Sequence, residues 1–235
     1  MDGVMNPTTN IISFDLTTTS LRDVNHYLHH QVSPGNHIDI HHPNGAHNLA
    51  VGLQEAIAVD IHGHTGYYAA GMNQLASVTI HGNAGAGVAE NMMSGRVHVK
   101  GFASVSAGAS AQGGLLVIDG DAGLRCGISL KGGDIVVGGS VGSFSAFMAQ
   151  AGHMVICGDA GDALGDSLYE AVLYVRGNIK SLGADAQIEP MTEDDQAIVA
   201  NLLEQAGFSH NPNDFQRVAS ARQLYHWNAD AKQDY

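Results

Sequence analysis

Histidine and aspartate recur at one place in successive segments of the amino-terminal half of the chain. His41, His62 and His81 each precede a regularly repeated position, and Asp39 and Asp60 stand two residues before the first two histidines. Imidazole nitrogen and carboxylate oxygen are ligands that Zn²⁺ takes in proteins. The pattern permits a metal site at His41, His62 and His81. We expect instead a polar ladder that faces solvent or a partner, because a surface column lacks the closed tetrahedral convergence of a structural zinc site.

Two other stretches carry residue types that can do chemistry. Residues 115–133, LLVIDGDAGLRCGISLKGG, are glycine-rich like a phosphate-binding loop, and Asp159, Asp162 and Asp166 form an acidic cluster. A nucleotide loop needs a Gly-Lys-Ser/Thr ending or a long helix after it, and this stretch has neither. The aspartates could bind Ca²⁺ or act as an acid–base pair, but we expect a solvated acidic corner. We therefore predict no catalytic and no cofactor-binding residues in this chain.

The glycines repeat with a period of nineteen residues, and this period explains the glycine-rich stretch. One series runs through seven positions without a gap: Gly63, Gly82, Gly101, Gly120, Gly139, Gly158 and Gly177. A second series, three residues later, holds Gly66, Gly85, Gly123, Gly142 and Gly161, with Ser104 and Lys180 at its remaining positions. We predict structural corners here, because a sharp corner favours positive φ and stacked turns leave no room for a side chain.

Apolar residues keep the same period and predict the strands. The residues four and two positions before each glycine are all apolar, from Val59 and Ile61 to Leu173 and Val175, with mostly polar residues between them. Such alternation predicts a short strand in every repeat with one face inward, and stacked repeats bury a continuous core. The fold class is therefore all-β: a right-handed, single-stranded parallel β-helix. Ile38 and Ile40 add an earlier turn, with His42 at the glycine position and Gly45 after it.

Composition narrows the possible partners. The chain has 235 residues, of which 14% are charged, and a formal net charge of −13. An acidic surface disfavours nucleic acid and anionic membranes as partners. The amino terminus shows no signal-peptide pattern and no apolar run is long enough for a membrane span, so we expect a cytoplasmic protein. Cys126 and Cys157 occupy different repeat positions and are expected to be reduced thiols.

The flanking segments predict helical caps at both ends of the solenoid. We divide the chain into an amino-terminal cap with a short helix (1–36), the β-helix (37–190) and a carboxy-terminal helical cap and tail (191–235). The first helix is expected from about Ser20, with Leu21, Val24 and Leu28 on one stripe. The second is expected from the N-cap Thr192 to the C-cap Gly207, covering the end of the stack.

A further helix is expected in the tail, starting near Asn213. Its apolar and basic side chains are typical of an interface with another protein, and we expect the solenoid to fold without them. The alternative is that the tail packs back along the outer face of the β-helix. The predicted interface residues are Phe215, Arg217, Arg222, Leu224, Tyr225 and Trp227.

The glycine series, from IHGHTGYYAAG through ICGDAGDALGD, resembles the GXGXG domain family over about residues 37–190. That right-handed β-helix closes the large subunit of glutamate synthase and recurs as a subunit of formylmethanofuran dehydrogenase. In glutamate synthase it supports the amidotransferase and FMN-containing domains and holds no catalytic residue. A free-standing chain ending in DFQRVASARQLYHW is most similar to the B subunit of N-methylglutamate synthase, also called methylamine–glutamate N-methyltransferase. Ser104, Lys180 and His42 depart from the glycine pattern and mark wider or terminal turns.

The resemblance implies a non-catalytic scaffold subunit of a complex that makes N-methylglutamate and ammonia from methylamine and glutamate. The implied partners are an amidotransferase-like subunit and an FMN-containing synthase subunit with an iron–sulfur centre, in a hetero-oligomer, and this chain itself holds no cofactor. Three alternatives stay open: a subunit of an ammonia-assimilating glutamate synthase, a subunit of a formylmethanofuran dehydrogenase-type complex, and a stand-alone metal-binding protein that uses the His/Asp ladder.

Overall fold

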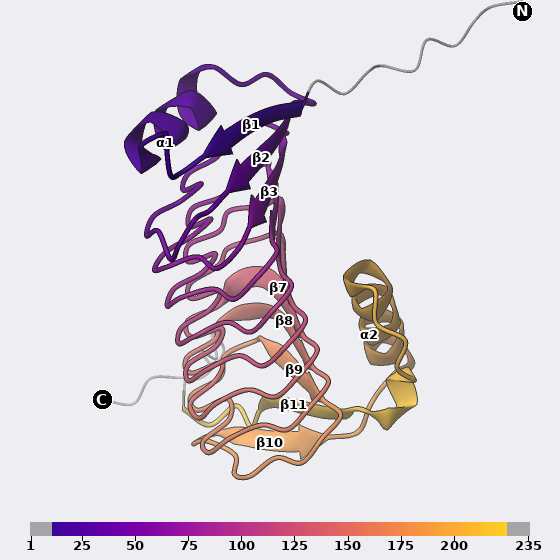
Figure 1. Ribbon diagram of the computed structural model, residues 1–235. Coiled ribbons are helices and arrows are strands. Elements are labelled where there is room, and N and C mark those ends of the chain that lie inside the picture. Colours follow the sequence, from indigo (N-terminus) through magenta and orange to yellow (C-terminus); the bar gives the residue numbers. More distant parts are fainter. Residues whose placement is uncertain (1–10, 225–235) are drawn as a thin grey trace, which may run out of the picture.

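The protein is a stack of turns built on a single sheet. The computed structural model describes residues 11–224, and its eleven strands follow the order β1 to β9, then β11 and β10 (Figure 1). The elements are β1 Ile11–Asp15, α1 Leu21–His30, β2 His37–His41, β3 Ala58–His62, β4 Ser77–Ile80, β5 Arg96–Val99, β6 Leu115–Ile118, β7 Lys131–Val137, β8 Ala151–Ile156, β9 Val172–Val175, β10 Ala186–Glu189, α2 Glu193–Ala206, a short 3₁₀ helix Pro212–Asp214 and β11 Gln216–Ser220.

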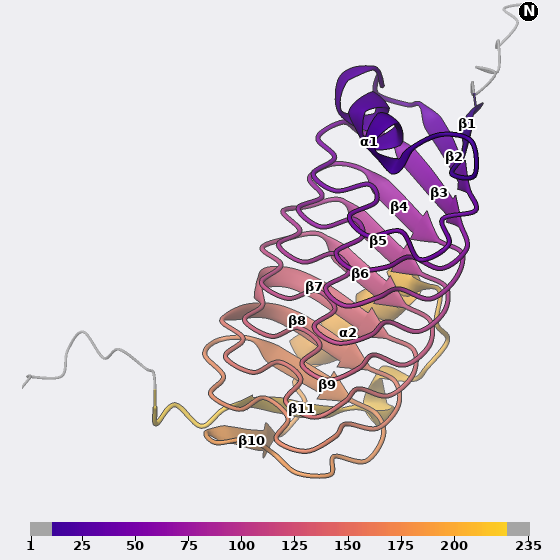
Figure 2. The same cartoon turned by 60° about the vertical axis from the view of Figure 1, so that its left-hand side comes forward.

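The predicted β-solenoid is confirmed. From β1 to β9 every strand pairs in parallel with the next, and the apolar columns meet in register, for example Val59 with Val78 and Ile61 with Ile80. The inward residues of both columns, from Val59 to Val175, have no exposed surface. One short strand per repeat is enough because the neighbouring turns on both sides satisfy its backbone groups. Figure 2 shows the turns stacked along one axis.

The corner glycines are required by close stacking and not by positive φ. In the two glycine series from Gly63 and from Gly66 onward only Gly63 has positive φ, and His42 and Gly45 of the earlier turn share it, so the expectation of left-handed corners was wrong for the repeated turns. A Cβ on Gly120 would lie 3.0 Å from the carbonyl oxygen of Gly101, and one on Gly142 would lie 2.7 Å from the backbone nitrogen of Leu124. The backbone of the preceding turn therefore fills the space that a side chain would need.

Most left-handed residues lie further along each turn, in three columns with the same period, and Gly95, Gly114, Gly132 and Gly152 add a further set just before or within the next strand. The three columns stand five, seven and nine residues after the corner glycine, as in Tyr68, Ala70 and Met72 of one turn. The middle column contains the small residues that the sequence marked seven positions after the glycine. Alanine, serine and even arginine (Arg125) adopt this conformation here, because hydrogen bonds to the turns above and below hold the backbone in place.

The amino-terminal cap contains the predicted helix and an additional strand. Ser20 caps α1 by accepting a hydrogen bond from the Asp23 amide, and Val24 and Leu28 are buried on the predicted stripe. β1 was not predicted, because α1 separates it from the next strand and breaks the period. It pairs in parallel with β2 and extends the sheet by one strand.

Helix α2 has the predicted caps but does not cover the end of the stack. Thr192 and Asp195 form a capping box and Gly207 is left-handed. The apolar stripe of α2 packs on the outer face of the sheet, against residues including Val117, Val136 and Tyr174. In Figure 1 the helix stands beside the turns of β7 to β9. The prediction of an end cap was wrong because the outward residues of these strands are themselves apolar and need a cover.

The helix expected near Asn213 is also absent, and a strand takes its place. β11 lies antiparallel between β9 and β10, with Val218 opposite Leu173 and Ile188. Phe215 and Val218 are buried, so these two residues belong to the core. The two sheet neighbours, β9 and β10, decide between strand and helix for this segment.

Cys126 and Cys157 are free and buried, as the prediction of reduced thiols requires. Burial raises the pKa of Cys126 to about 12 and that of Cys157 to about 11. Both thiols therefore stay protonated and unreactive near neutral pH. Within residues 11–224, no helix combines the length and the apolarity that crossing a membrane would require.

Asp195 joins α2 to the end of the sheet, and we expect its replacement to be costly. Its carboxylate accepts hydrogen bonds from the Tyr174 hydroxyl (2.8 Å) and from Arg217 Nε (3.1 Å), as well as from Thr192. Partial burial acts to raise the pKa of Asp195, but the hydrogen bonds from Thr192 and Tyr174 and the charge of Arg217 outweigh it and keep the pKa low. Replacing one member of such a buried network costs about 3–5 kcal/mol.

The prediction for Asp195→Asn is therefore a lower unfolding midpoint in urea at pH 7. The extra stability that the Asp195 carboxylate gives the wild type is present above the ordinary aspartate pKa of about 3.9. It is lost as the pH falls through the lower pKa that Asp195 has in the folded protein. Urea unfolding of both proteins between pH 7 and pH 3 measures this. A constant difference between them across that range would contradict the assignment.

Candidate functional site

The outer face of the sheet divides into a polar half and a covered half. The outward position three residues before each corner is polar in the first turns and apolar in the later ones. In order it holds Asp39, Asp60, Thr79, His98, Val117, Val136, Val155 and Tyr174. Helix α2 packs on the apolar half. The polar half, on β2 to β5, carries the His/Asp ladder, and no helix of the described chain packs on it.

The predicted histidine ladder is present. The rings of His41 and His62 lie 4.6 Å apart at 9° to each other, and those of His62 and His81 lie 5.0 Å apart at 5°. This spacing follows the separation of adjacent strands.

Carboxylates tie the ladder together diagonally across the strands. His62 Nε2 lies 2.7 Å from the Asp39 carboxylate. The Asp60 carboxylate is hydrogen-bonded to His81 Nε2 at 2.5 Å and to His37 Nε2 at 2.8 Å. Burial acts to raise the pKa of Asp60, but the hydrogen bonds from His81 and His37 outweigh it and hold the pKa below its usual range. Both ring edges and carboxylates therefore point into one strip of surface. His37 was missed in the sequence, since it stands at the start of its strand.

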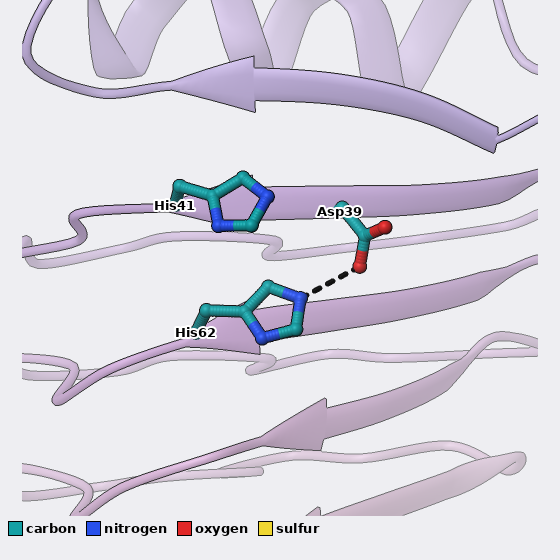
Figure 3. Close-up of side chains that lie close together, drawn as sticks. All are labelled: Asp39, His41 and His62. Atoms are coloured by element: carbon teal, nitrogen blue, oxygen red, sulfur yellow. Dashed lines mark hydrogen bonds and ion pairs between the residues drawn. The ribbon is translucent and has the colours of Figure 1, made fainter.

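Two groups of three side chains come close enough to share an ion. Asp39, His41 and His62 offer ligand atoms that lie within 4.8 Å of one another, and so do His37, Asp39 and Asp60. Figure 3 shows the ring edges of His41 and His62 turned toward the Asp39 carboxylate. The sequence predicted the ladder but not this convergence, because Asp39 reaches diagonally to the neighbouring strand.

The acidic cluster at the other end of the stack has structural roles, as expected for a solvated corner. Asp159 accepts a hydrogen bond from the backbone nitrogen of Asn178 at 2.7 Å, Asp162 pairs with Lys180 at 2.8 Å, and Asp166 receives the Ser167 hydroxyl. Similar bonds link other turns: Asp121, for example, accepts from the backbone of Ser140. Asp159 and Asp121 thus satisfy backbone amides of the next turn at the corners.

An apolar stripe that the sequence analysis did not single out runs along one corner of the stack. Tyr67, Val105 and Leu124 all stand four residues after a corner glycine and are 60%, 40% and 52% exposed. Phe102, in the same turn as Val105, is 51% exposed. We call these four side chains the corner stripe. Aligned apolar side chains on a soluble surface are typical of a protein interface.

The predicted tail interface is partly occupied by the chain itself. Phe215 packs with α2 in the second core cluster. Arg217 forms ion pairs with Glu189 and Asp195. Arg222 and Leu224 are exposed and stay available to a partner. Tyr225 and Trp227 lie outside the described residues.

Comparison with known proteins finds a relative that the match covers over almost its whole length. The chain is 53% identical over 224 residues to Protein GlxC of Rhizobium meliloti (strain 1021), a match that covers 94% of this chain and 98% of that protein. No family model matches the chain, and no solved structure matches it. At this identity and coverage the two proteins share their whole architecture, and the chain belongs to the family of Protein GlxC.

Proposed function

We propose that this chain is a non-catalytic scaffold subunit of a glutamate synthase-like complex. The corner stripe is the observation that carries the proposal. A rigid stack holds its four apolar side chains in fixed positions on the surface, and exposed aromatic and aliphatic side chains of this kind are the usual anchors of protein interfaces. The glycine corners support a structural role for the repeat, because the backbone of the adjacent turn occupies the space that a side chain would need.

The partners in this proposal are an amidotransferase-like subunit and an FMN-containing synthase subunit with an iron–sulfur centre. The chemistry belongs to those subunits, and the proposed reaction converts methylamine and L-glutamate to N-methyl-L-glutamate and ammonia. The support is the resemblance of the glycine repeat to the GXGXG domain. The ammonia-assimilating glutamate synthase and the formylmethanofuran dehydrogenase-type complex predict the same scaffold with other substrates.

Activity of the purified complex distinguishes these reactions. We expect the complex to form N-methylglutamate from methylamine and glutamate, which mass spectrometry detects directly. Formation of glutamate from glutamine and 2-oxoglutarate, with no product from methylamine, would favour the ammonia-assimilating enzyme instead. A complex active in neither assay but acting on a formyl carrier would favour the third assignment.

The corner stripe gives a prediction of its own. The double variant Val105→Asp and Leu124→Asp is expected to fold normally but to bind its partner subunits roughly 100-fold more weakly, because loss of two interface anchors costs about 3 kcal/mol. Gel filtration of the reconstituted complex measures the loss. Gln112→Asp, at another exposed position, is the control for added charge. Full assembly by the double variant would show that the interface lies elsewhere.

A further inference from the structure

The structure assigns a Zn²⁺ site to Asp39, His41 and His62 on the polar half of the sheet face. Their ligand atoms lie within 4.8 Å of one another, and two imidazoles with one carboxylate form a ligand set that zinc uses. Figure 3 shows the rings of His41 and His62 one above the other on β2 and β3, both extending toward the Asp39 carboxylate. The inference concerns binding by this chain alone and does not depend on the proposed complex.

Closing the site requires the two stacked imidazole rings to turn toward the ion. Ligands at about 2.0–2.2 Å from a tetrahedral zinc ion lie roughly 3.3–3.5 Å from each other. The rings of His41 and His62 are 4.6 Å apart, so each must tilt toward the ion. The Asp39 and His62 side chains are 22% and 38% exposed, and no core packing fixes their rotamers. Three protein ligands leave the fourth coordination position to water, on the outer surface.

Charge favours a cation at this place. Asp39 and Asp60 are direct partners in the β2–β3 ladder, and like charges opposite each other in a sheet are destabilising. The two carboxylates thus bring two negative charges to neighbouring positions on adjacent strands. A divalent ion bound to Asp39 neutralises this charge, while Asp60, held by His37 and His81, stays beside the ligands as an outer carboxylate.

A second histidine pair requires a control. The rings of His26 and His30, one turn apart on α1, lie 4.6 Å from each other, and such a pair can itself hold a transition metal. His98 provides another control, because it pairs with Asp119 on the same sheet face but belongs to neither group of converging ligands. Variants at His30 and His98 therefore separate the proposed site from general histidine binding.

The test is a zinc titration of the untagged full-length chain after removal of metal with a chelator. Competition with a chromophoric chelator is expected to give one tight site, weakened at least tenfold by His62→Ala and by Asp39→Asn. His30→Ala and His98→Ala should bind like the wild type. Affinity should fall between pH 7.5 and 5.5, because protons compete for the imidazole nitrogens.

Circular dichroism shows whether a variant has lost zinc binding because its structure has changed. X-ray absorption identifies the ligands of the bound zinc directly. The variants at Asp39, His62 and His30 are expected to keep the wild-type spectrum, and the spectrum of His98→Ala shows whether this more buried side chain can be replaced without structural change. X-ray absorption of the zinc-loaded wild type should show nitrogen and oxygen ligands with the scattering pattern of two imidazoles. Unchanged affinity in His62→Ala, loss of the site in His30→Ala, or absence of zinc binding by the wild type would each overturn the inference.

Discussion

A chain that ends at Gly207 is expected to lose cooperative unfolding and to aggregate when it is expressed alone. Truncation there removes β11, which lies between β9 and β10. Burial of a side chain such as Phe215 or Val218 contributes about 1.5–3 kcal/mol each, and both are buried in the protein. The edges of β9 and β10 would then be open to other molecules. This expectation replaces the one from sequence, in which the solenoid folds without its tail.

Thermal unfolding and gel filtration of the truncated chain measure this effect. Val218→Asp should reproduce much of the loss, since it buries a charge in the core. Leu224→Asp is the matched control, because Leu224 is 54% exposed. A truncated chain that is monomeric and unfolds cooperatively near the wild-type temperature would show that β11 is dispensable.

Valine at Gly139 is expected to be strongly destabilising. A Cβ at this position would lie 2.8 Å from the carbonyl carbon of Gly120 and 2.9 Å from the backbone nitrogen of Asp121, and it would contact the Asp121 carboxylate. Backbone atoms cannot move aside without disturbing the next turn. We expect a loss of about 3 kcal/mol or more, which lowers the melting temperature by roughly 6–12 °C for a chain of this length.

Ser104→Val is the matched control, since Ser104 already places a Cβ in a corner position of the same stack. Scanning calorimetry of the two variants gives the comparison. The steric account predicts a small change for Ser104→Val and a large one for Gly139→Val. Equal shifts would contradict the close approach of successive turns.

The nineteen-residue period and the apolar–polar alternation were enough to predict the solenoid, because every repeat packs against neighbours of the same kind. Val59 and Ile61 recur as apolar residues in every later turn, and only stacked strands bury both columns. The ladder of His41, His62 and His81 followed from the same register, because a fixed period places equivalent residues on adjacent strands. Repeat position therefore predicted both the core and the first part of the candidate site.

The flanks lie outside the repeat, and their structure depends on contacts that have no period. At the outward position three residues before each corner, the residue type changes from polar (His98) to apolar (Val117). This change was visible in the sequence and marks the start of the surface under α2. It could have placed the helix on the side of the stack. β11 could not be predicted in the same way, because its strand conformation depends on β9 and β10. The diagonal bond from Asp39 to His62 depends on side-chain reach.

The central claim is that this chain is a scaffold subunit, and its most direct test is the composition of the complex that it forms. The measurement is affinity purification of the tagged chain from its own cells, followed by mass spectrometry of the stoichiometric components and by absorbance spectroscopy. The account predicts an amidotransferase-like chain and an FMN-containing synthase chain in fixed proportion, with the flavin spectrum lost when the corner stripe carries Val105→Asp and Leu124→Asp. A chain that elutes alone at its own mass, or with stoichiometric partners of neither class, would contradict it.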